Sequence, residues 1–507
     1  MIFSVNTKQM QKAEQLSEEQ GVSRARLMKN AARGCLEFIK GRFENYRTLS
    51  YALVCGSGNN GGDGIELAFL LTEAGAEANV VLTDKIPDTD TAKICIRSHK
   101  IPLKGTSFTK NPHKAKVMLK EADVIIDCVF GTGFHGDLPK DIEELFKFIN
   151  NSCGSFKISV DIPSGVNGNS GKISQNSFKP HATLVLAAVK SGMLNYPCHD
   201  FCGELRVVSI GISDRCYKEY EGIFTPKDIT RLLPQRPASS NKGTFGKLLN
   251  VAGSRRYRGA AVLSSKAALR AGAGLVTLAS VEEAISAAAA SLPECVFLNL
   301  SADGDGFIDG KSKDMLGEEA EKASAITVGC GMGNTGSTKE TVMFLLKKGN
   351  CPIILDADGI NCLDGNINVL KDNDRPIILT PHPGEFARLI KASVPEVQGS
   401  RLELARSFAA EYRAVLLLKG QNTVIAAPDG KAYINTSGNN ALAKAGNGDV
   451  LTGIIGALAA QGMEPFYAAV SGAYLHGRSA DILVEGGANP ASVLAGEVAD
   501  GLRLISD

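Results

Sequence analysis

The 507-residue sequence contains no tryptophan, and aromatic residues make up only 6% of it. It also lacks an excess of charge of either sign, because 55 Lys and Arg stand against 54 Asp and Glu, for a formal net charge of +1. Such a chain has no overall field that would draw it to nucleic acid or to an anionic membrane surface. We therefore expect neither nucleic acid nor a membrane among its partners.

Long hydrophobic runs and paired cysteines are missing as well. No stretch of about 18 apolar residues occurs, and the N-terminal segment turns polar too early for a signal peptide. The 12 cysteines are scattered singly, without a Cys-x-x-Cys pair, and Cys198 and Cys202 are the closest two. Buried free thiols in a reducing compartment explain this pattern, which predicts a cytoplasmic protein.

Glycine is the residue present in excess, with 54 in 507, or about 11% against a usual value near 7%. Hydrophobic residues at 44% and charged residues at 21% are ordinary for a globular enzyme. The length predicts two to four domains, and the glycine excess predicts tight turns and close approach of the backbone to ligands.

Short apolar segments separated by Gly-rich or helical stretches run through both halves of the chain. In the first half they cover residues 51–55, 80–82, 123–130, 157–163 and 182–189. Spacings of about 25 to 45 residues leave room for crossover helices, so we predict an α/β fold with a doubly wound parallel sheet of the Rossmann type. Residues 8–42 before this sheet read as two helices, with Ser23 as a cap.

The pattern breaks at residues 221–247, where Pro226, Pro234 and Pro237 predict a connecting segment. A second series of strand-like segments then begins, at residues 248–253, 274–280, 325–331, 352–358, 376–381 and 414–420. We therefore divide the chain into an N-terminal domain, residues 1–220, and a C-terminal α/β domain, residues 224–507.

A Gly-rich segment, GSGNNGGDG, follows the first strand and contains the G-x-G-x-x-G spacing of a dinucleotide-binding turn, which is weak evidence alone. Asn59, Asn60 and Asp63 lie in what reads as a turn before a helix. They offer oxygen ligands to a hard cation, beside backbone amides that can bind an anion. A solvated turn with Asx caps is the alternative interpretation.

Two acids, Asp127 and Asp161, each end a predicted strand and are followed by Gly-rich loops at residues 131–137 and 162–165. In a parallel sheet the carboxyl ends of the strands converge on one edge, so we expect these loops and the Gly-rich segment to meet in one crevice. A single Asp at a strand end is more often a cap, but acids at successive strand ends favour a site.

The phrases SGNNGGDG, DCVFGTG and VDIPSGVNG, with LMKNAARG before them, resemble those of the NAD(P)H-hydrate epimerase family over residues 5–215. The resemblance implies a potassium ion held by Asn60, Asp127 and Ser164, and Asp161 as an acid/base catalyst. It also implies that the hydrated cofactor is contacted by Asn59, Asn60, Gly61, Gly62, Asp63, Gly131, Thr132, Gly133, Phe134, His135, Gly136, Asp137 and Asp161.

In the second half, the segment AKAGNGD leads into an apolar helix predicted over residues 450–462. Amides at such a helix start can bind a phosphate, and Asp449 beside them can accept a proton from a hydroxyl; an Asp that merely caps the helix is the alternative. The TPHPGE segment predicts a rigid turn that aims His382 and Glu385, and Lys419 ends a strand where it can meet a phosphate. No Walker A pattern occurs, which excludes a P-loop enzyme.

The phrases GTFGK, LDADGIN, TPHPGE, LLLKG and AGNGDVLTG resemble the ADP- or ATP-dependent NAD(P)H-hydrate dehydratases of the ribokinase-like group, over residues 224–507. The resemblance implies a ribokinase-like αβα domain, Asp449 as catalytic base and Mg²⁺ with the nucleotide. One departure is Cys330, where a proline is expected. The resemblance further implies substrate contacts from Ala260, Gly333, His382 and Asp449, and nucleotide contacts from Lys419, Gly420, Gln421, Asn422, Thr423 and Gly448.

Together the two resemblances predict a bifunctional enzyme, an isomerase and a lyase, that repairs hydrated NADH and NADPH. One domain would interconvert the R and S epimers, and the other would dehydrate the S form with ADP or ATP as phosphoryl donor, a choice that the sequence leaves open. The alternative is a ribokinase-like kinase of a vitamin or small alcohol, fused to a dinucleotide-binding regulatory module. We also expect a homo-oligomer.

Overall fold

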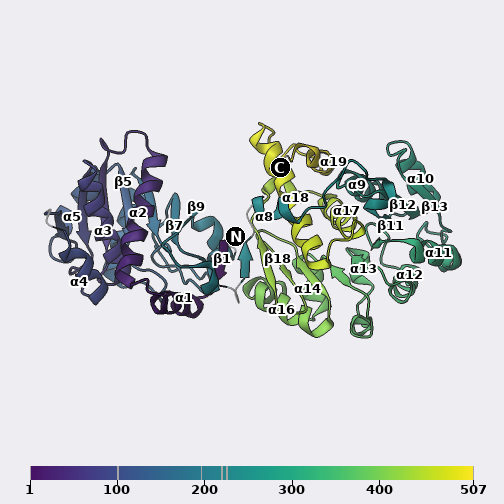
Figure 1. Cartoon of the computed structure of the whole chain (residues 1–507), viewed down its shortest axis with the longest axis horizontal. Helices are drawn as coiled ribbons and strands as arrows, with labels where there is room; N and C mark the ends of the chain where they lie inside the picture. The colour runs from purple at the N-terminus through teal and green to yellow at the C-terminus, as the bar shows by residue number, and fades with distance from the viewer. Residues whose placement is uncertain (1, 100–101, 196, 218–220, 224–225, 506–507) are drawn as a thin grey trace. The chain divides into compact units, whose positions relative to one another are not determined.

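The computed structural model describes residues 2–99, 102–195, 197–217, 221–223 and 226–505. Its contacts divide the chain into two compact units, Ile2–Glu221 and Gly222–Asp507 (Figure 1). Residues 220 and 224, where we placed the predicted domain boundary, lie outside the described residues, as do the chain ends 1 and 507.

The N-terminal unit is built on a parallel sheet with the strand order β4-β3-β2-β5-β6-β7-β9. Chain order runs outward in both directions from β2, which confirms the doubly wound topology predicted from the strand spacing. Two further strands of this unit, β1 and β8, form a short parallel pair in which Val5 lies opposite Lys190. The strands are β1 (Ile2–Val5), β2 (Ser50–Cys55), β3 (Glu77–Leu82), β4 (Lys104–Ser107), β5 (Val124–Cys128), β6 (Phe156–Val160), β7 (Ala182–Leu186), β8 (Val189–Lys190) and β9 (Glu204–Val208).

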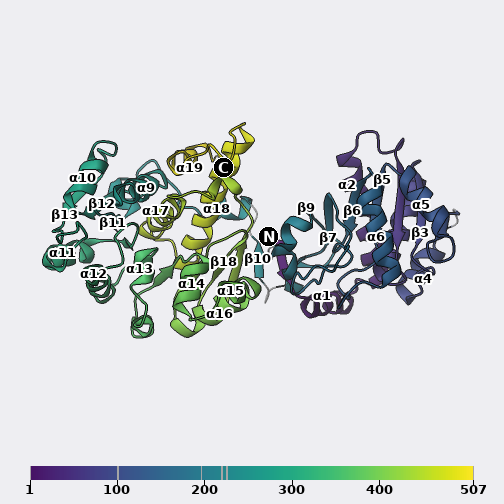
Figure 2. The ribbon, with the colours of Figure 1, turned by 180° about the vertical axis from the view of Figure 1, so that it is seen from behind.

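Helices cover both faces of this sheet. Because successive strand residues point to opposite faces, Leu53 packs in the cluster beneath α2 and α3, whereas Val54 packs in the cluster beneath α5 and α6. Figure 1 shows α2 and α3 on one face, and Figure 2 shows α6 on the other. Ser23 caps α2 as predicted, its hydroxyl accepting from the Arg26 amide. The helices are α1 (Thr7–Glu19), α2 (Arg24–Arg42), α3 (Asn59–Glu73), α4 (Asp90–Arg97), α5 (Pro112–Glu121), α6 (Lys140–Ser152) and α7 (Cys198–Phe201).

The C-terminal unit contains a second sheet, ordered β13-β12-β11-β14-β15-β16-β17-β18-β19, with β10 beside β19. The strands from β13 to β17 are parallel, and β18 pairs antiparallel with both neighbours. The strands are β10 (Glu221–Ile223), β11 (Lys247–Val251), β12 (Leu275–Ser280), β13 (Val296–Asn299), β14 (Ala325–Val328), β15 (Ile353–Leu355), β16 (Ile377–Leu379), β17 (Val415–Leu418), β18 (Thr423–Ala426) and β19 (Ala432–Asn435).

Two hydrophobic clusters flank this second sheet and make it the middle layer of an αβα unit. Leu248 and Ile354 face the cluster that contains α17 and α18, and the next residues along each strand face the opposite cluster. Most residues of α17 are buried, as its apolar composition requires. The helices are α8 (Pro226–Leu232), α9 (Arg258–Arg270), α10 (Glu282–Ala289), α11 (Lys313–Lys322), α12 (Gly336–Lys347), α13 (Asp358–Asn361), α14 (Pro383–Leu389), α15 (Val394–Gly399), α16 (Arg401–Tyr412), α17 (Asn447–Ala460), α18 (Pro465–Glu485) and α19 (Ala495–Gly501).

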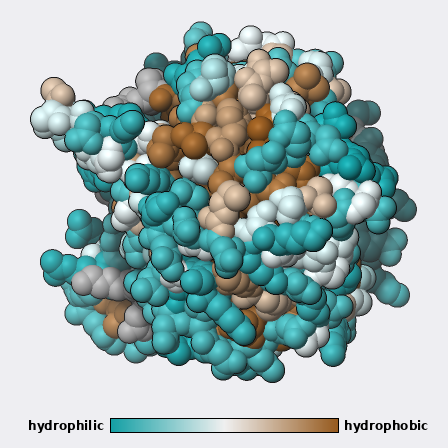
Figure 3. Space-filling model, turned by 90° about the vertical axis from the view of Figure 1, so that its right-hand side faces the viewer, coloured by the Kyte–Doolittle hydropathy of each residue, from teal (hydrophilic) through white to brown (hydrophobic). Residues whose placement is uncertain are grey.

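The surface is mostly hydrophilic on the face drawn in Figure 3, which shows a large hydrophobic area in its upper half and smaller ones below. Among the described residues, no helix combines the length and the hydrophobicity needed to cross a membrane. The large hydrophobic side chains that are exposed in the C-terminal unit are Tyr257, Val296, Met315, Val394, Leu494 and Leu504.

A fragment of residues 224–507 should fold by itself, because the C-terminal unit has its own sheet and its own cores. We expect one cooperative urea transition in its far-ultraviolet circular dichroism. The control fragment 275–507 lacks β11, a strand paired on both sides, and should show no cooperative transition. A fragment 224–507 that behaves like this control would contradict the predicted domain boundary.

Candidate active sites

A cavity of about 1060 Å³ opens at the carboxyl ends of β2, β5 and β6 in the N-terminal unit. Residues of the first two predicted loops line it, together with Asp161 after β6 and residues of α1 and α2, whereas residues 162–165 of the third loop are not among the lining residues. The predicted substrate residues that line it are Asn59, Asn60, Asp63, Gly131, Thr132, Gly133, Phe134, His135, Asp137 and Asp161; Gly61, Gly62 and Gly136 are not among the lining residues.

The predicted Gly-rich turn is shorter than expected. Helix α3 begins at Asn59 with Gly58 as its N-cap, so Asn59 to Gly64 are helical and the expectation of a turn through Asp63 was wrong. The reason is packing: a Cβ on Gly61 would lie 1.9 Å from the Gly56 carbonyl oxygen. Glycine lets the helix start pack directly on the end of β2, and the free amides of that start lie at the cavity.

Two of the predicted potassium ligands, Asp127 and Ser164, are not among the residues that line the cavity, and the third, Asn60, lines it. Asp127 is fully buried, and both its carboxylate oxygens accept bonds from Ser164, 2.6 Å from the hydroxyl and 2.8 Å from the amide. Burial raises the pKa of Asp127 to about 6, although these hydrogen bonds and those from Val129 and Ser159 act to lower it. The site is thus a compact cluster of oxygen atoms.

Asn60 joins this cluster through its side-chain amide. Its Nδ2 donates to the carbonyl oxygens of Phe130, at 3.0 Å, and Val160, at 3.2 Å. Its Oδ1 is buried and has no hydrogen-bond partner among the described residues. Buried acceptors are normally hydrogen-bonded, so an unpaired buried oxygen indicates a place for a donor or a cation.

Asp161 follows β6 with a backbone φ of +72°, a left-handed conformation that is strained for a residue with a side chain. One carboxylate oxygen, Oδ2, accepts from the Thr132 amide at 3.3 Å. The other, Oδ1, accepts from the ammonium of Lys190, which also donates to the Leu186 carbonyl at 3.0 Å. The sequence analysis missed Lys190; the signal was a lysine directly after the apolar run 182–189.

Two further acids of the cavity are shifted toward their neutral forms. Burial, followed by the charge of Asp161, raises the pKa of Glu14 and raises that of Asp63 well above its ordinary value. Lys8, Lys12 and Arg24 also line the cavity and supply positive charge for an anionic ligand. The cavity therefore suits a ligand with both phosphates and a reactive polar group.

In the C-terminal unit, the predicted phosphate-binding segment begins helix α17. Gly446, at φ +93°, is the N-cap, so the helix starts at Asn447, earlier than predicted, and Asp449 lies in its first turn. The alternative that Asp449 caps the helix is wrong for this reason. Burial, followed by the charge of Asp356, raises the pKa of Asp449 to about 6.

Asp356, directly after β15, organises this site. Its Oδ1 accepts from Thr380 Oγ1 and from Lys419 Nζ, each at 2.8 Å, and its Oδ2 accepts from Thr452 Oγ1 at 2.9 Å. Burial would raise the pKa of Asp356, but the Lys419 charge and these hydrogen bonds lower it. The sequence analysis missed both Asp356 and Thr452, although Asp356 stands at a strand end in the LDADGIN phrase.

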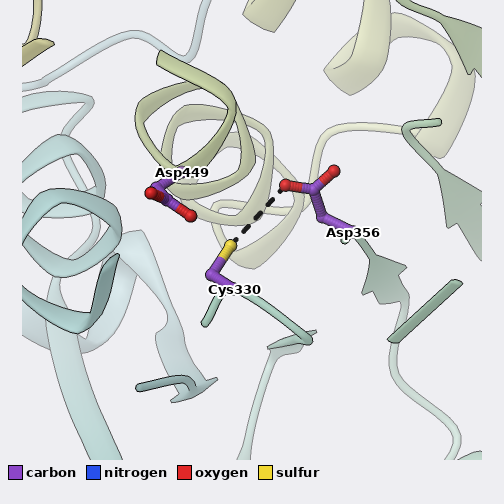
Figure 4. Close-up of side chains that lie close together, drawn as sticks. All are labelled: Cys330, Asp356 and Asp449. Carbon is purple, nitrogen blue, oxygen red and sulfur yellow. Dashed lines mark hydrogen bonds between the residues drawn. The ribbon is translucent and has the colours of Figure 1, made fainter. Parts of the chain in front are cut away.

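Cys330 lies between the two acids (Figure 4). Its Sγ is 3.7 Å from Asp356 Oδ2, and ligand atoms of Cys330, Asp356 and Asp449 lie within 4.8 Å of one another. Burial, with the two carboxylates, raises the pKa of the thiol well above its ordinary value. Cys330 is therefore a neutral donor that separates two carboxylates.

The other predicted residues of this unit adjoin the same strand ends. His382 is the N-cap of α14 and accepts from the Gly384 and Glu385 amides through Nδ1, so its neutral ring carries the proton on Nε2. The segment is the start of a helix and not the predicted turn, because Pro383, Gly384 and Glu385 form the first turn of α14. Gly333 donates from its amide to Asp358 Oδ2 at 2.7 Å, and a Cβ on Gly331 would lie 2.7 Å from Ala260 Cβ.

The predicted nucleotide segment, residues 419–423, connects β17 to β18. Arg401 lies beneath it and donates to the carbonyl oxygens of Leu418, Lys419 and Gln421; burial lowers the pKa of this guanidinium to about 10. A Cβ on Gly448 would lie 3.4 Å from Lys419 Nζ. The structure thus brings the nucleotide segment next to the start of α17.

These features define a two-part α/β enzyme with one site in a Rossmann-like unit and another in a ribokinase-like unit. Residues 24–192 match the family model described as YjeF-related protein N-terminus, and residues 248–500 match the model described as NAD(P)H-hydrate dehydratase.

Whole-length relatives carry the same two parts. A bifunctional NAD(P)H-hydrate repair enzyme of Moorella thermoacetica is 36% identical over 472 residues, 90% of this chain and 87% of that protein. One from Escherichia coli is 31% identical over 91% and 86%. A solved ADP/ATP-dependent NAD(P)H-hydrate dehydratase of Bacillus subtilis, co-crystallised with ATP and Mg²⁺, is 34% identical with a TM-score of 0.49, covering 56% of this chain and 97% of that one.

The chain belongs to the family of bifunctional NAD(P)H-hydrate repair enzymes. Both resemblances found in the sequence are confirmed. The alternative of a small-alcohol kinase with a regulatory module is not supported.

Replacing Thr452 by Val should lower the free energy of unfolding of the C-terminal unit by about 1–3 kcal/mol, because it removes a donor to a buried carboxylate. Thr341→Val is the matched control, since this equally buried hydroxyl donates only to a helix carbonyl that keeps its amide partner. Urea unfolding followed by circular dichroism measures both. Equal losses in the two variants would contradict the role given to Asp356.

Proposed function

We propose that this chain repairs hydrated NADH and NADPH at two separate sites. The N-terminal unit interconverts the R and S epimers at C6 of the hydrated ring, and the C-terminal unit dehydrates the S epimer with ADP or ATP as phosphoryl donor. The observation that carries this proposal is the presence of two acid centres, Asp161 and Asp449, each at the strand ends of a unit that matches one half of the family.

For the dehydratase, Asp449 is the base that takes the proton from the C6 hydroxyl. That oxygen then attacks the terminal phosphoryl group and displaces the rest of the nucleotide. The ring nitrogen's lone pair expels the resulting phosphate from C6, and loss of a proton from C5 restores the C5–C6 double bond of the reduced ring. The amides of Gly446 to Gly448 at the start of α17 stabilise the transferring group. Bound Mg²⁺ would neutralise nucleotide phosphate charge. We assign substrate contacts to Ala260, Gly333 and His382, and nucleotide contacts to residues 419–423 and Gly448.

For the epimerase, Asp161 assists loss of water from one face of the ring and its return to the other. The C6–oxygen bond breaks as the ring nitrogen shares its lone pair, and a new C6–oxygen bond forms as a water gives up a proton. We assign ring and phosphate contacts to residues 59–63, at the start of α3, and to residues 131–137, in the loop whose Thr132 amide donates to Asp161.

Potassium fits the cluster of Asn60, Asp127 and Ser164. The supporting observation is the buried Asn60 Oδ1 without a partner among the described residues, beside carbonyl and carboxylate oxygens that suit a hard cation. The ion would supply positive charge behind the loops that receive the cofactor's phosphates.

We also place the two activities in separable domains, residues 1–220 and 224–507, in a cytoplasmic enzyme. All 12 cysteines are free thiols, and 11 of them are buried, as a reducing compartment allows. The homo-oligomeric state expected from the sequence stays a prediction.

Asp449→Asn should lower dehydration of the S epimer by about 10²–10⁴-fold while the nucleotide still binds. In the unmodified enzyme the rate should fall as the pH drops through about 6, because protonation removes the base. The measurement is recovery of the near-ultraviolet absorbance of reduced nicotinamide from hydrated NADH, with ADP and with ATP. Near-normal turnover of the variant would remove Asp449 from the catalytic role.

Asp161→Ala should abolish epimerisation and leave dehydration unchanged, because effects at distant independent sites do not couple. Given a mixture of epimers and nucleotide, this variant should consume the S epimer quickly and the R epimer only at the spontaneous rate. Chromatographic separation of the epimers follows both. Rapid consumption of both epimers would contradict the assignment, and equal slowing of both would indicate a regulatory unit instead.

A further inference from the structure

Lys190 is a buried cation at the base of the epimerase cavity. Its side chain is 1% exposed, and Asp161 is its only charged partner among the described residues. A lysine is almost never buried to this extent unless it is paired, because desolvation of an ammonium is costly. Its position follows from β8, where Lys190 pairs with Val5 of β1.

The backbone on both sides of this ion pair is strained. Asp161 has a φ of +72°, and Ala187, three residues before Lys190, has a φ of +64°. Non-glycine residues hold this conformation only where the surrounding structure imposes it, and such residues gather at functional sites. Asp161 directly follows β6. Ala187 directly follows β7, and the chain then enters β8, which carries Lys190. The two strained residues therefore lie where the chain brings the carboxylate next to the ammonium.

The two carboxylate oxygens of Asp161 have different partners. Oδ1 is taken by Lys190, whose second bond, to the Leu186 carbonyl at 3.0 Å, ties the ammonium to the end of β7. Oδ2 faces the loop that lines the cavity, 3.3 Å from the Thr132 amide and 3.1 Å from where a Cβ would stand on Gly131. The glycine leaves the approach to Oδ2 open, so one oxygen is anchored and the other is presented to a ligand.

We propose that Lys190 is a positioning residue of the epimerase site, whose ammonium anchors Asp161 through Oδ1 so that Oδ2 meets the C6 hydroxyl or the incoming water. This inference rests on the epimerase activity proposed above. Lys190 acts through Asp161, because the two hydrogen bonds that the structure gives its ammonium go to Asp161 and to the backbone of Leu186.

Lys190→Met, which keeps an unbranched side chain one atom shorter and removes its charge, should lower the epimerase kcat by about 10²-fold with little change in KM, since misplacement of a reacting group has this effect. Lys190→Arg should restore a large part of the rate. The assay starts from one purified epimer of hydrated NADH without nucleotide, so that the dehydratase is idle, and follows the other epimer by chromatography. Urea unfolding of the N-terminal unit of each variant, followed by circular dichroism, is the control for correct folding, because Lys190 lies in that unit.

A double-variant comparison separates positioning from a merely structural role. If Lys190 acts through Asp161, adding Lys190→Met to Asp161→Asn should cost no further activity, because the anchored carboxylate is already gone. Multiplying losses, or a Lys190→Met enzyme that keeps its kcat, would overturn the inference. Should Lys190→Met fail to fold, Lys190→Gln replaces it, retaining a donor without the charge.

The same assay distinguishes failure of the inference from failure of the proposed function. An unmodified enzyme that does not interconvert the epimers contradicts the epimerase activity itself. An active unmodified enzyme whose Lys190 variants keep full kcat contradicts only the positioning role.

Discussion

Parallel strands end at the same edge of their sheet, and this constraint places both sites of the chain. Each strand is followed by a turn before its crossover helix begins, so turns from several strands collect at one edge. In the N-terminal unit the turns after β2, β5 and β6 meet around one cavity. In the C-terminal unit the ends of β15, β16 and β17 deliver Asp356, Thr380 and Lys419 to one another. Helix starts at the same edges add amides that suit phosphate groups.

Each site also contains an ion pair between an aspartate at one strand end and a lysine from another: Asp161 with Lys190, and Asp356 with Lys419. The two ion pairs differ in whether the aspartate keeps a carboxylate oxygen available for a ligand. Asp356 receives donors on both oxygens, so in the proposed mechanism it is an anchor and Asp449 is the base. The environments of these two acids shift their pKa values in opposite directions: the pKa of Asp356 is lowered, and that of Asp449 is raised to about 6. Asp161 keeps Oδ2 toward the loop that lines the cavity, and this is the oxygen that the proposed epimerase mechanism uses.

Several elements of the fold could be predicted because the hydrophobicity of their residues indicates whether the element is buried. Strands buried on both faces, such as β16 and β17, are continuous apolar runs. The half-exposed strand β4, with the sequence KGTS, carries no such pattern and was missed. Helices α3 and α17 start earlier than predicted, at Asn59 and Asn447, because glycine is a poor helix former and conceals a helix that close packing requires.

The sequence by itself determined the fold class, the strand ends that carry the sites and the family, because these depend on local patterns and contiguous motifs. Only the tertiary structure decided which side chains hold the reactive groups. Lys190 reaches Asp161 across 29 positions, Lys419 reaches Asp356 across 63, and Thr452 reaches Asp356 across 96. Such contacts depend on how strands are ordered in a sheet, and spacing along the chain carries no record of that order.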